Sequence, residues 1–203
     1  MLRIRHLIPS VLLAAGCAHA CAEEGNGWDL RLALGGAPGV AKAKTDNSGA
    51  SSDIDDHGGG TIRFSAYYTP DIAGQIGLQF GPNIAVSRHN GHTAGGDFDV
   101  SDSSVGFAIG PFLRVARWRF GLTPYIDLGS AREHDDAGHS DSGPYVALGL
   151  TVGAMYTFDN HLILGADLGV EGWSSKVHQP GIDADVTYSG SGGVFDIYVG
   201  FKL

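Results

Sequence analysis

The chain has 203 residues, with 22 acidic and 13 basic residues, a formal net charge of −9 and 32 glycines. This acidic balance argues against nucleic acid as a partner. The glycines follow no Gly-X-Y period, which excludes a collagen-like chain. Both cysteines, Cys17 and Cys21, lie near the N-terminus. The rest of the chain therefore offers no disulfide, thiolate nucleophile or cysteine metal site, and no cofactor is expected.

Residues 1–22 have the pattern of a cleaved secretory signal peptide. A start with two arginines precedes a short apolar core over residues 7–15, and Ala20-Cys21-Ala22 forms an A-x-A cleavage site. Cleavage after Ala22 leaves residues 23–203 as one domain. A lipoprotein cut before Cys17 is the alternative, because Ala14-Ala15-Gly16 before that cysteine is similar to a lipobox.

Beyond the signal, apolar residues recur at every second position in eight segments, and a period of two indicates β-strands. In chain order the segments are residues 28–35, 61–68, 74–86, 104–115, 118–128, 145–158, 162–172 and 195–203. Long polar stretches (residues 37–59, 87–103, 130–143 and 173–189) alternate with short turns. An even number of strands joined in this way is typical of bacterial outer-membrane proteins.

The fold predicted from this pattern is all-β: an eight-stranded antiparallel up-and-down transmembrane β-barrel with four long external loops and short periplasmic turns. The last segment shows the pattern most clearly. Its apolar residues from Phe195 to Leu203 occupy one phase, and Asp196 and Lys202 occupy the other. We expect this strand to close the barrel against residues 28–35, with both termini periplasmic.

The alternating residues of each predicted strand form two surfaces, one that faces outward and one that faces the barrel interior. Aromatic residues of the outward phase collect at the short-turn ends and predict a periplasmic aromatic girdle: Trp28, Tyr68, Trp118, Phe120, Tyr156, Phe158 and Phe201. Charged residues of the inward phase predict a polar network inside the barrel: Arg31, Arg63, Arg114, Asp127, Asp167, Glu171, Asp196 and Lys202. Buried charges require partners, so we expect ion pairs that fill the interior.

The predicted external loops are rich in histidine and aspartate, which supply nitrogen and oxygen ligands for divalent metals. The candidate metal ligands are His89, His92, His134, Asp135, Asp136 and His139. Solvated loops would have the same composition, so this reading competes with a purely hydrophilic surface.

The chain resembles the small outer-membrane β-barrel proteins, namely the OmpA transmembrane domain, OmpX and the opacity-type adhesins. The motifs that carry the resemblance are the terminal strand 195–203, Thr123-Pro124-Tyr125 followed by Gly129, and residues 155–160, Met-Tyr-Thr-Phe-Asp-Asn. The resemblance implies an outer-membrane location in contact with lipid and lipopolysaccharide. It also implies a C-terminal strand that is presented to the barrel insertion machinery.

Such a fold does not choose its function. We expect a monomeric, non-enzymatic structural or surface-interaction (adhesin-like) protein, whose external loops contact a host or matrix ligand. A small-solute channel is the first alternative, because the inward charges could line a water path. A lipid A-modifying enzyme is the second, although His139-Ser140 in a predicted loop is its only suggestive pair.

Overall fold

The computed structural model describes residues 26–46, 49, 51–93, 96–135, 142–179 and 183–203. The predicted signal peptide lies outside these residues. The described part of the chain contains no helix that is long and apolar enough to cross a membrane.

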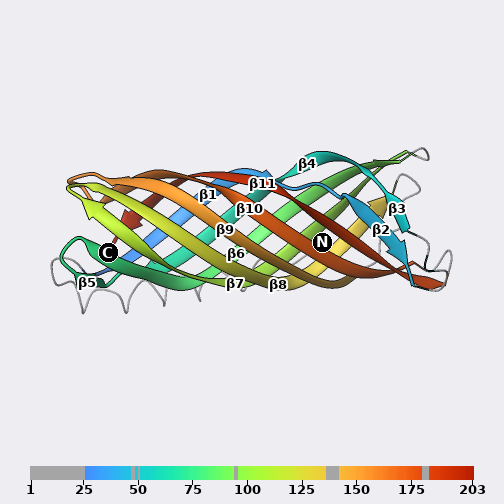
Figure 1. Ribbon diagram of the computed structural model, residues 1–203, viewed down its shortest axis with the longest axis horizontal. Helices are drawn as coiled ribbons and strands as arrows, with labels where there is room; N and C mark the ends of the chain where they lie inside the picture. Colours follow the sequence, from blue (N-terminus) through green and yellow to red (C-terminus); the bar gives the residue numbers. More distant parts are fainter. Residues whose placement is uncertain (1–25, 47–48, 50, 94–95, 136–141, 180–182) are drawn as a thin grey trace, which may run out of the picture.

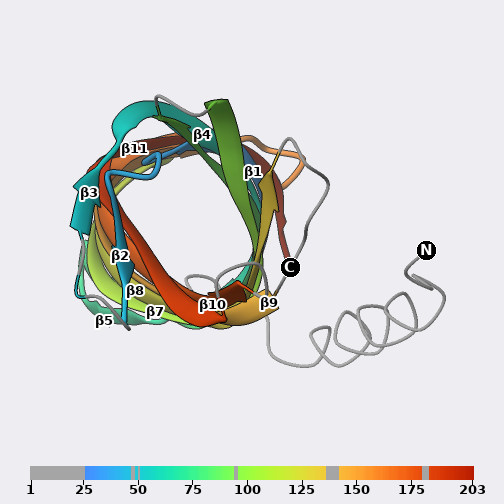
Figure 2. The same cartoon turned by 90° about the vertical axis from the view of Figure 1, so that its right-hand side faces the viewer.

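The described chain forms a single antiparallel sheet of eleven strands. The strands are β1 (Trp28–Ala37), β2 (Lys42–Thr45), β3 (Ser51–Asp53), β4 (Asp55–Tyr68), β5 (Asp71–Ala73), β6 (Ile76–Thr93), β7 (Gly96–Val115), β8 (Trp118–Asp135), β9 (Ser142–Thr157), β10 (Leu162–Gln179) and β11 (Ala184–Lys202). Figure 1 shows the eight long strands crossing the molecule at a common tilt, and Figure 2 shows the ring that they form.

The ring closes where the first long strand meets the last. β1 pairs with β4 on one side and with β11 on the other, in a register that joins Asp29 to Lys202 and Gly36 to Phe195. The order of the remaining wall strands follows the sequence, from β4 through β6, β7, β8, β9 and β10 to β11. This confirms the predicted eight-stranded up-and-down barrel and the predicted pairing of its two end strands.

A continuous band of exposed apolar side chains surrounds one part of the barrel. Leu34, Ile62, Val105, Leu148 and Val170 in this band are each more than half exposed. In water such a surface would be unfavourable, whereas in a bilayer it is the surface that contacts hydrocarbon. Toward the end that carries the long hairpins, the outward-facing residues change from apolar to polar. On β6, for example, the outward residue that follows Val86 is Arg88.

In the residues that the structure describes, the four polar stretches predicted as long loops are largely strand, so the prediction of loops is wrong there. β6 and β7 run on as a ladder to the pair Thr93 and Gly96, and β10 and β11 run on to Gln179 and Ala184. The walls thus continue as paired hairpins well beyond the apolar band. The first polar stretch contains β2 and β3, with β2 paired to the upper end of β11.

The loop prediction fails because the apolar phase reverses at the edge of the band. On β7, Val105 points outward and is 63 % exposed, whereas Val100 points inward and is fully buried. Trp173 and Val177 are inward on β10 in the same way. Beyond the lipid the outer face of the barrel meets water, so the apolar side chains there point inward. A sequence pattern defined by outward apolar residues therefore ends at the edge of the band.

The paired hairpins beyond the apolar band form an extension of the barrel. The apolar side chains that point into this extension pack together in one core. Its buried members are Val40, Ile54, Val100, Ala131, Tyr145, Ala147, Trp173, Val177, Val186 and Tyr188. Val40 and Ile54 come from the chain around β2 and β3 rather than from the upper walls. The Val40 amide donates to the carbonyl of Asn90 on β6, and the Ala41 amide donates to that of Ser189 on β11, at 2.9 Å each. The segment between β1 and β2 is thus held against the inside of the barrel.

Glycine stands opposite several of the large inward side chains. Gly149 is the register partner of Tyr125, and Gly165 is that of Tyr198. A Cβ atom added at Gly149 would lie 2.1 Å from Tyr125 Cζ. The ring therefore occupies the space that a side chain on the next strand would need. This close packing explains part of the high glycine content without invoking turns.

Candidate functional site

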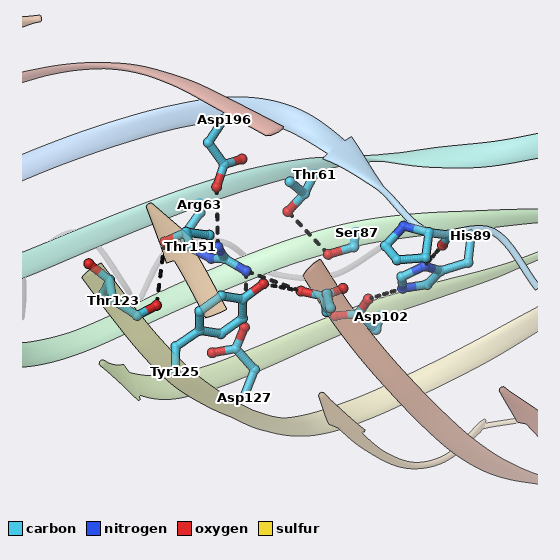
Figure 3. Close-up of polar contacts among 12 residues, drawn as sticks. Thr61, Arg63, Ser87, His89, Asp102, Thr123, Tyr125, Asp127, Thr151 and Asp196 are labelled. Carbon is cyan, nitrogen blue, oxygen red and sulfur yellow. Dashed lines mark hydrogen bonds and ion pairs between the residues drawn. The ribbon is translucent and has the colours of Figure 1, made fainter. Parts of the chain in front are cut away.

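The centre of the barrel interior is Arg63 on β4, which is surrounded by three carboxylates. Its guanidinium donates to Asp127 at 3.2 Å and to Asp196 at 3.3 Å, and lies 3.7 Å from Glu171. The Tyr125 ring lies 4.4 Å from the guanidinium carbon, and its hydroxyl donates to Glu171 at 2.5 Å. Figure 3 shows Arg63, Tyr125, Asp127 and Asp196 from this cluster. The members of the cluster come from β4, β8, β10 and β11.

A second cluster surrounds Asp29, which is fully buried on β1. Arg31 donates to one Asp29 oxygen at 3.0 Å, and Arg119 donates to the same oxygen at 2.5 Å. Arg31 also donates to Gln79, whose amide in turn donates to Thr123. The two clusters connect six strands of the barrel, β1, β4, β6, β8, β10 and β11, through charge-assisted hydrogen bonds.

The predicted polar network is in large part brought together. Arg31, Arg63, Asp127, Glu171 and Asp196 are all buried inside and ion-paired. Asp167 accepts a hydrogen bond from Tyr198 at 3.4 Å and lines the same small cavity as Arg31 and Arg63.

Two predicted members of the network lie at the rim instead. Arg114 pairs with Asp71 beside the short turn that holds β5, at 2.7 Å. Lys202 is partly exposed at the end of β11 and forms no ion pair with any residue that the structure describes. Asp29 and Arg119 belong to the interior cluster but are missing from the predicted network. Arg119 lies between the outward residues Trp118 and Phe120, so the strand phase alone places it inside.

The space left between these side chains is small. One cavity of about 20 Å³ is lined by residues that include Arg31, Arg63 and Asp167. A second of about 10 Å³ lies beside Gln79 and Arg119. Each has room for about one water molecule. Around these described residues, side chains thus fill most of the interior, as expected for an eight-stranded barrel.

His89 lies at the boundary between the polar interior and the apolar core. The sequence places it in an external loop as a metal ligand, but it is on β6 and fully buried. Its Nδ1 lies 2.6 Å from the Pro38 carbonyl, and its Nε2 lies 3.1 Å from Asp102. The Trp173 ring stacks on it at 4.1 Å. The predicted position of His89 is therefore wrong, because β6 continues through that region.

His89 fastens the segment before β2 to the wall. A carbonyl oxygen only accepts hydrogen bonds, so Nδ1 must donate to Pro38. Asp102, Tyr145 and Trp173 hold the imidazole from β7, β9 and β10. The arrangement explains this histidine as an anchor within the fold.

The other predicted metal ligands do not form a cluster in the described part of the chain. His92 is exposed, and its Nδ1 lies 2.5 Å from Asp97. The side chains of His134 and Asp135 are not described, and Asp136 and His139 lie outside the described residues. Among the residues that are described, no group of three or more His, Cys, Asp or Glu residues could hold a metal ion.

The aromatic residues predicted as a girdle lie at the end of the barrel that carries the short turns. Trp28 pairs with Tyr68 and Trp118 with Tyr156 across neighbouring strands, with ring centroids 5.5 Å and 5.1 Å apart. Phe158 lies 4.8 Å from Tyr156. Phe120 and Phe201 are exposed on the same outward face. Amphipathic rings at one edge of an apolar band are suited to the headgroup level.

At the opposite end, a charged cluster fastens β2 to β10 and β11. Lys176 lies 2.6 Å from Asp46 and 3.1 Å from Asp185, and His178 lies 3.0 Å from Asp185. Hydrogen bonds from His178 and Lys176 lower the pKa of Asp185, and those to Asp46 and Asp185 raise the pKa of Lys176. These groups are exposed, so the contribution to stability is modest.

A closed ring with an outer apolar band, a charged interior and polar hairpins at one end defines a transmembrane barrel of the outer-membrane class. The sequence profile of the family described as "Outer membrane protein beta-barrel domain" matches residues 8–189. The chain belongs to this family and to the bacterial outer membrane, where such barrels contact lipid and lipopolysaccharide. No curated protein sequence matches it significantly.

Solved outer-membrane barrels have a similar arrangement at low sequence identity. Ail of Yersinia pestis is 14 % identical, with a TM-score of 0.46 over 88 % of this chain and 99 % of Ail. Neisserial surface protein A is 16 % identical, with a TM-score of 0.41 over 85 % and 98 %. The outer membrane protease OmpT of Escherichia coli is 8 % identical, with a TM-score of 0.49 over 91 % and 99 %.

Proposed function

We propose that this chain is a non-enzymatic outer-membrane barrel that acts through the outer surface of its projecting hairpins, as a structural and surface-interaction protein. The observation that supports this proposal is the phase reversal on β7, β10 and β11, which gives the part beyond the apolar band its own core and a polar exterior. Such a part stands in water as a stiff platform that can present side chains to a partner. The first and last described residues, Asn26 and Leu203, lie at the other end, which we assign to the periplasm.

A small-solute channel is less well supported by the same contacts. Arg63 and its three carboxylates fill the middle of the barrel, and the apolar core around Trp173 fills its upper part. Breaking the central ion pairs to open a path would leave buried charges without partners, which is costly.

The orientation is tested with single cysteines, because the chain has none after Cys21. Asp97 and Asp159 lie at opposite ends, and each side chain is 80 % exposed. On intact cells a membrane-impermeant maleimide should label Asp97→Cys and should label Asp159→Cys only after the outer membrane is permeabilised. The reverse pattern would contradict the assignment of the hairpins to the cell exterior.

The function itself is tested by adhesion and by conductance. Cells that produce the chain should adhere to matrix-coated surfaces several-fold better than cells that lack it. Replacement of the outward residues of the β6–β7 hairpin should reduce this adhesion while the barrel still folds. The purified protein in planar bilayers should give no stepwise conductance. Steady channel openings together with unchanged adhesion would favour the solute channel instead.

A further inference from the structure

Beyond the apolar band, the outward side chains change with distance from the band: arginines lie close to it, and an aspartate lies further out. Arg88 lies two residues beyond Val86 on β6, and Arg132 lies four residues beyond Leu128 on β8. At about 3.3 Å per residue they stand roughly 7 and 13 Å along their strands from the last lipid-facing residue, and less in height because the strands tilt. This is the headgroup level. The acidic Asp97 lies further out, at the tip of the β6–β7 hairpin.

The two arginines belong to one row across three strands. Arg88 on β6 is the register partner of Ser101 on β7, and Ser101 is the register partner of Arg132 on β8. Neighbouring strands are about 4.8 Å apart, so the arginine backbones stand about 10 Å apart with a serine between them. Exposed serines, Ser103 and Ser130, form the next outward pair toward the lipid.

Both guanidinium groups are accessible. The Arg88 side chain is 65 % exposed and contacts Asp99 through one nitrogen at 2.6 Å, and this contact does not use the other N–H donors of its fork. Arg132 is exposed and has no carboxylate partner among the residues that the structure describes. The Ser101 hydroxyl donates to the Arg132 carbonyl at 3.4 Å, which holds the two strands together at the centre of the row.

We propose that Arg88 and Arg132 together bind a phosphate group of lipopolysaccharide in the outer leaflet. Phosphate matches the planar donor fork of arginine. It is also the anion that the surrounding leaflet presents at this height. The proposal rests on the orientation given under the proposed function, and it extends that function by naming a lipid partner and the residues that contact it.

The test uses the full-length folded protein in a neutral detergent and two probes, diphosphorylated lipid A and the same lipid after removal of its phosphates. Bound lipid is counted by native mass spectrometry. Wild type should prefer the phosphorylated probe, and R88Q/R132Q should lose about tenfold in affinity for it, since charge-assisted hydrogen bonds to both arginines disappear. Affinity for the dephosphorylated probe should not change.

The matched control is K42Q/K44Q, which removes two exposed positive charges from β2 at the same end of the barrel. It should bind like wild type. An equal loss in both double variants would show general charge attraction, and a wild type without preference for phosphate would also overturn the proposal. Each variant is first checked for a different gel mobility before and after boiling, as expected of a closed barrel.

The proposed phosphate site and the proposed orientation can be rejected independently of each other. Lipid binding in detergent depends on the arginine row alone, whereas the labelling of Asp97→Cys and Asp159→Cys depends on orientation alone. A correct phosphate preference with reversed labelling would keep the binding site and reject the outer leaflet as its location.

Discussion

At the residue scale, the most informative side chain is Arg63. One guanidinium serves three carboxylates on three other strands, so its loss would leave several buried charges uncompensated. Asp196 is different, because its removal leaves Arg63 with Asp127 and Glu171. The asymmetry between the cation and its partners gives a direct prediction.

Arg63→Gln should lower the free energy of unfolding by about 3–5 kcal/mol, whereas Asp196→Asn should lower it by about 1 kcal/mol. The measurement is urea unfolding in lipid vesicles, followed by tryptophan fluorescence. Similar losses in the two variants would mean that the cluster does not depend on its single cation.

The interior charges could be predicted from sequence because strand phase decides which residues face inward. Arg63, Asp127 and Glu171 follow from counting by two within a recognised strand. His89 could not be predicted in the same way. It lies beyond Val86, where the outward residues become polar, and its anchor Pro38 is distant in sequence, so no local pattern indicates the contact.

At the element scale, β7, β10 and β11 each combine two patterns with opposite phases. The lower part is organised for lipid and the upper part for water, with the change at the edge of the apolar band. Sequence reasoning recognised the lower part of each strand and stopped at that edge, for example at Leu128 on β8. A second search, for apolar residues in the opposite phase, would have found Val100 and Val177.

The pairing of strands also depends on glycine opposite large side chains. Gly149→Ala should lower the free energy of unfolding by about 1–3 kcal/mol, because the new methyl group collides with the Tyr125 ring. Gly193→Ala is the control: its Cβ has no neighbour closer than 4.0 Å, so the change should stay within about 0.5 kcal/mol. Thermal unfolding of both variants, side by side, measures the difference. If both variants lost the same free energy of unfolding, the loss would come from the restricted backbone conformation of alanine rather than from a collision with the Tyr125 ring.

At the scale of the whole molecule, the barrel is a bilayer-spanning cylinder continued by a water-exposed one. The closed ring, the strand number and the apolar band were all predictable, because lipid imposes a simple alternating pattern. The extension was not, because β2 joins the wall by pairing with the upper end of β11, which is distant in sequence, and no local sequence signal specifies that contact.

This architecture predicts resistance to proteolysis outside the membrane. Trypsin added to the folded protein should leave the bonds after Arg88, Arg132 and Lys176 intact. Arg88 and Arg132 are paired with a neighbouring strand on both sides, and Lys176 is paired with β11 and held by Asp46 and Asp185. After boiling, all three should be cut. The fragments are identified by mass spectrometry. Rapid cleavage at Arg88 in the folded protein would restore the interpretation of this region as a loop.

The inward core of the extension also bears on how such a surface changes over evolutionary time. Val100, Trp173 and Val177 maintain the shape from within, whereas outward side chains such as Arg88 and His92 contribute little to that core. Substitutions on the outside therefore carry a small folding penalty. A lineage under immune or phage pressure can replace the exposed face residue by residue while the scaffold beneath it stays the same.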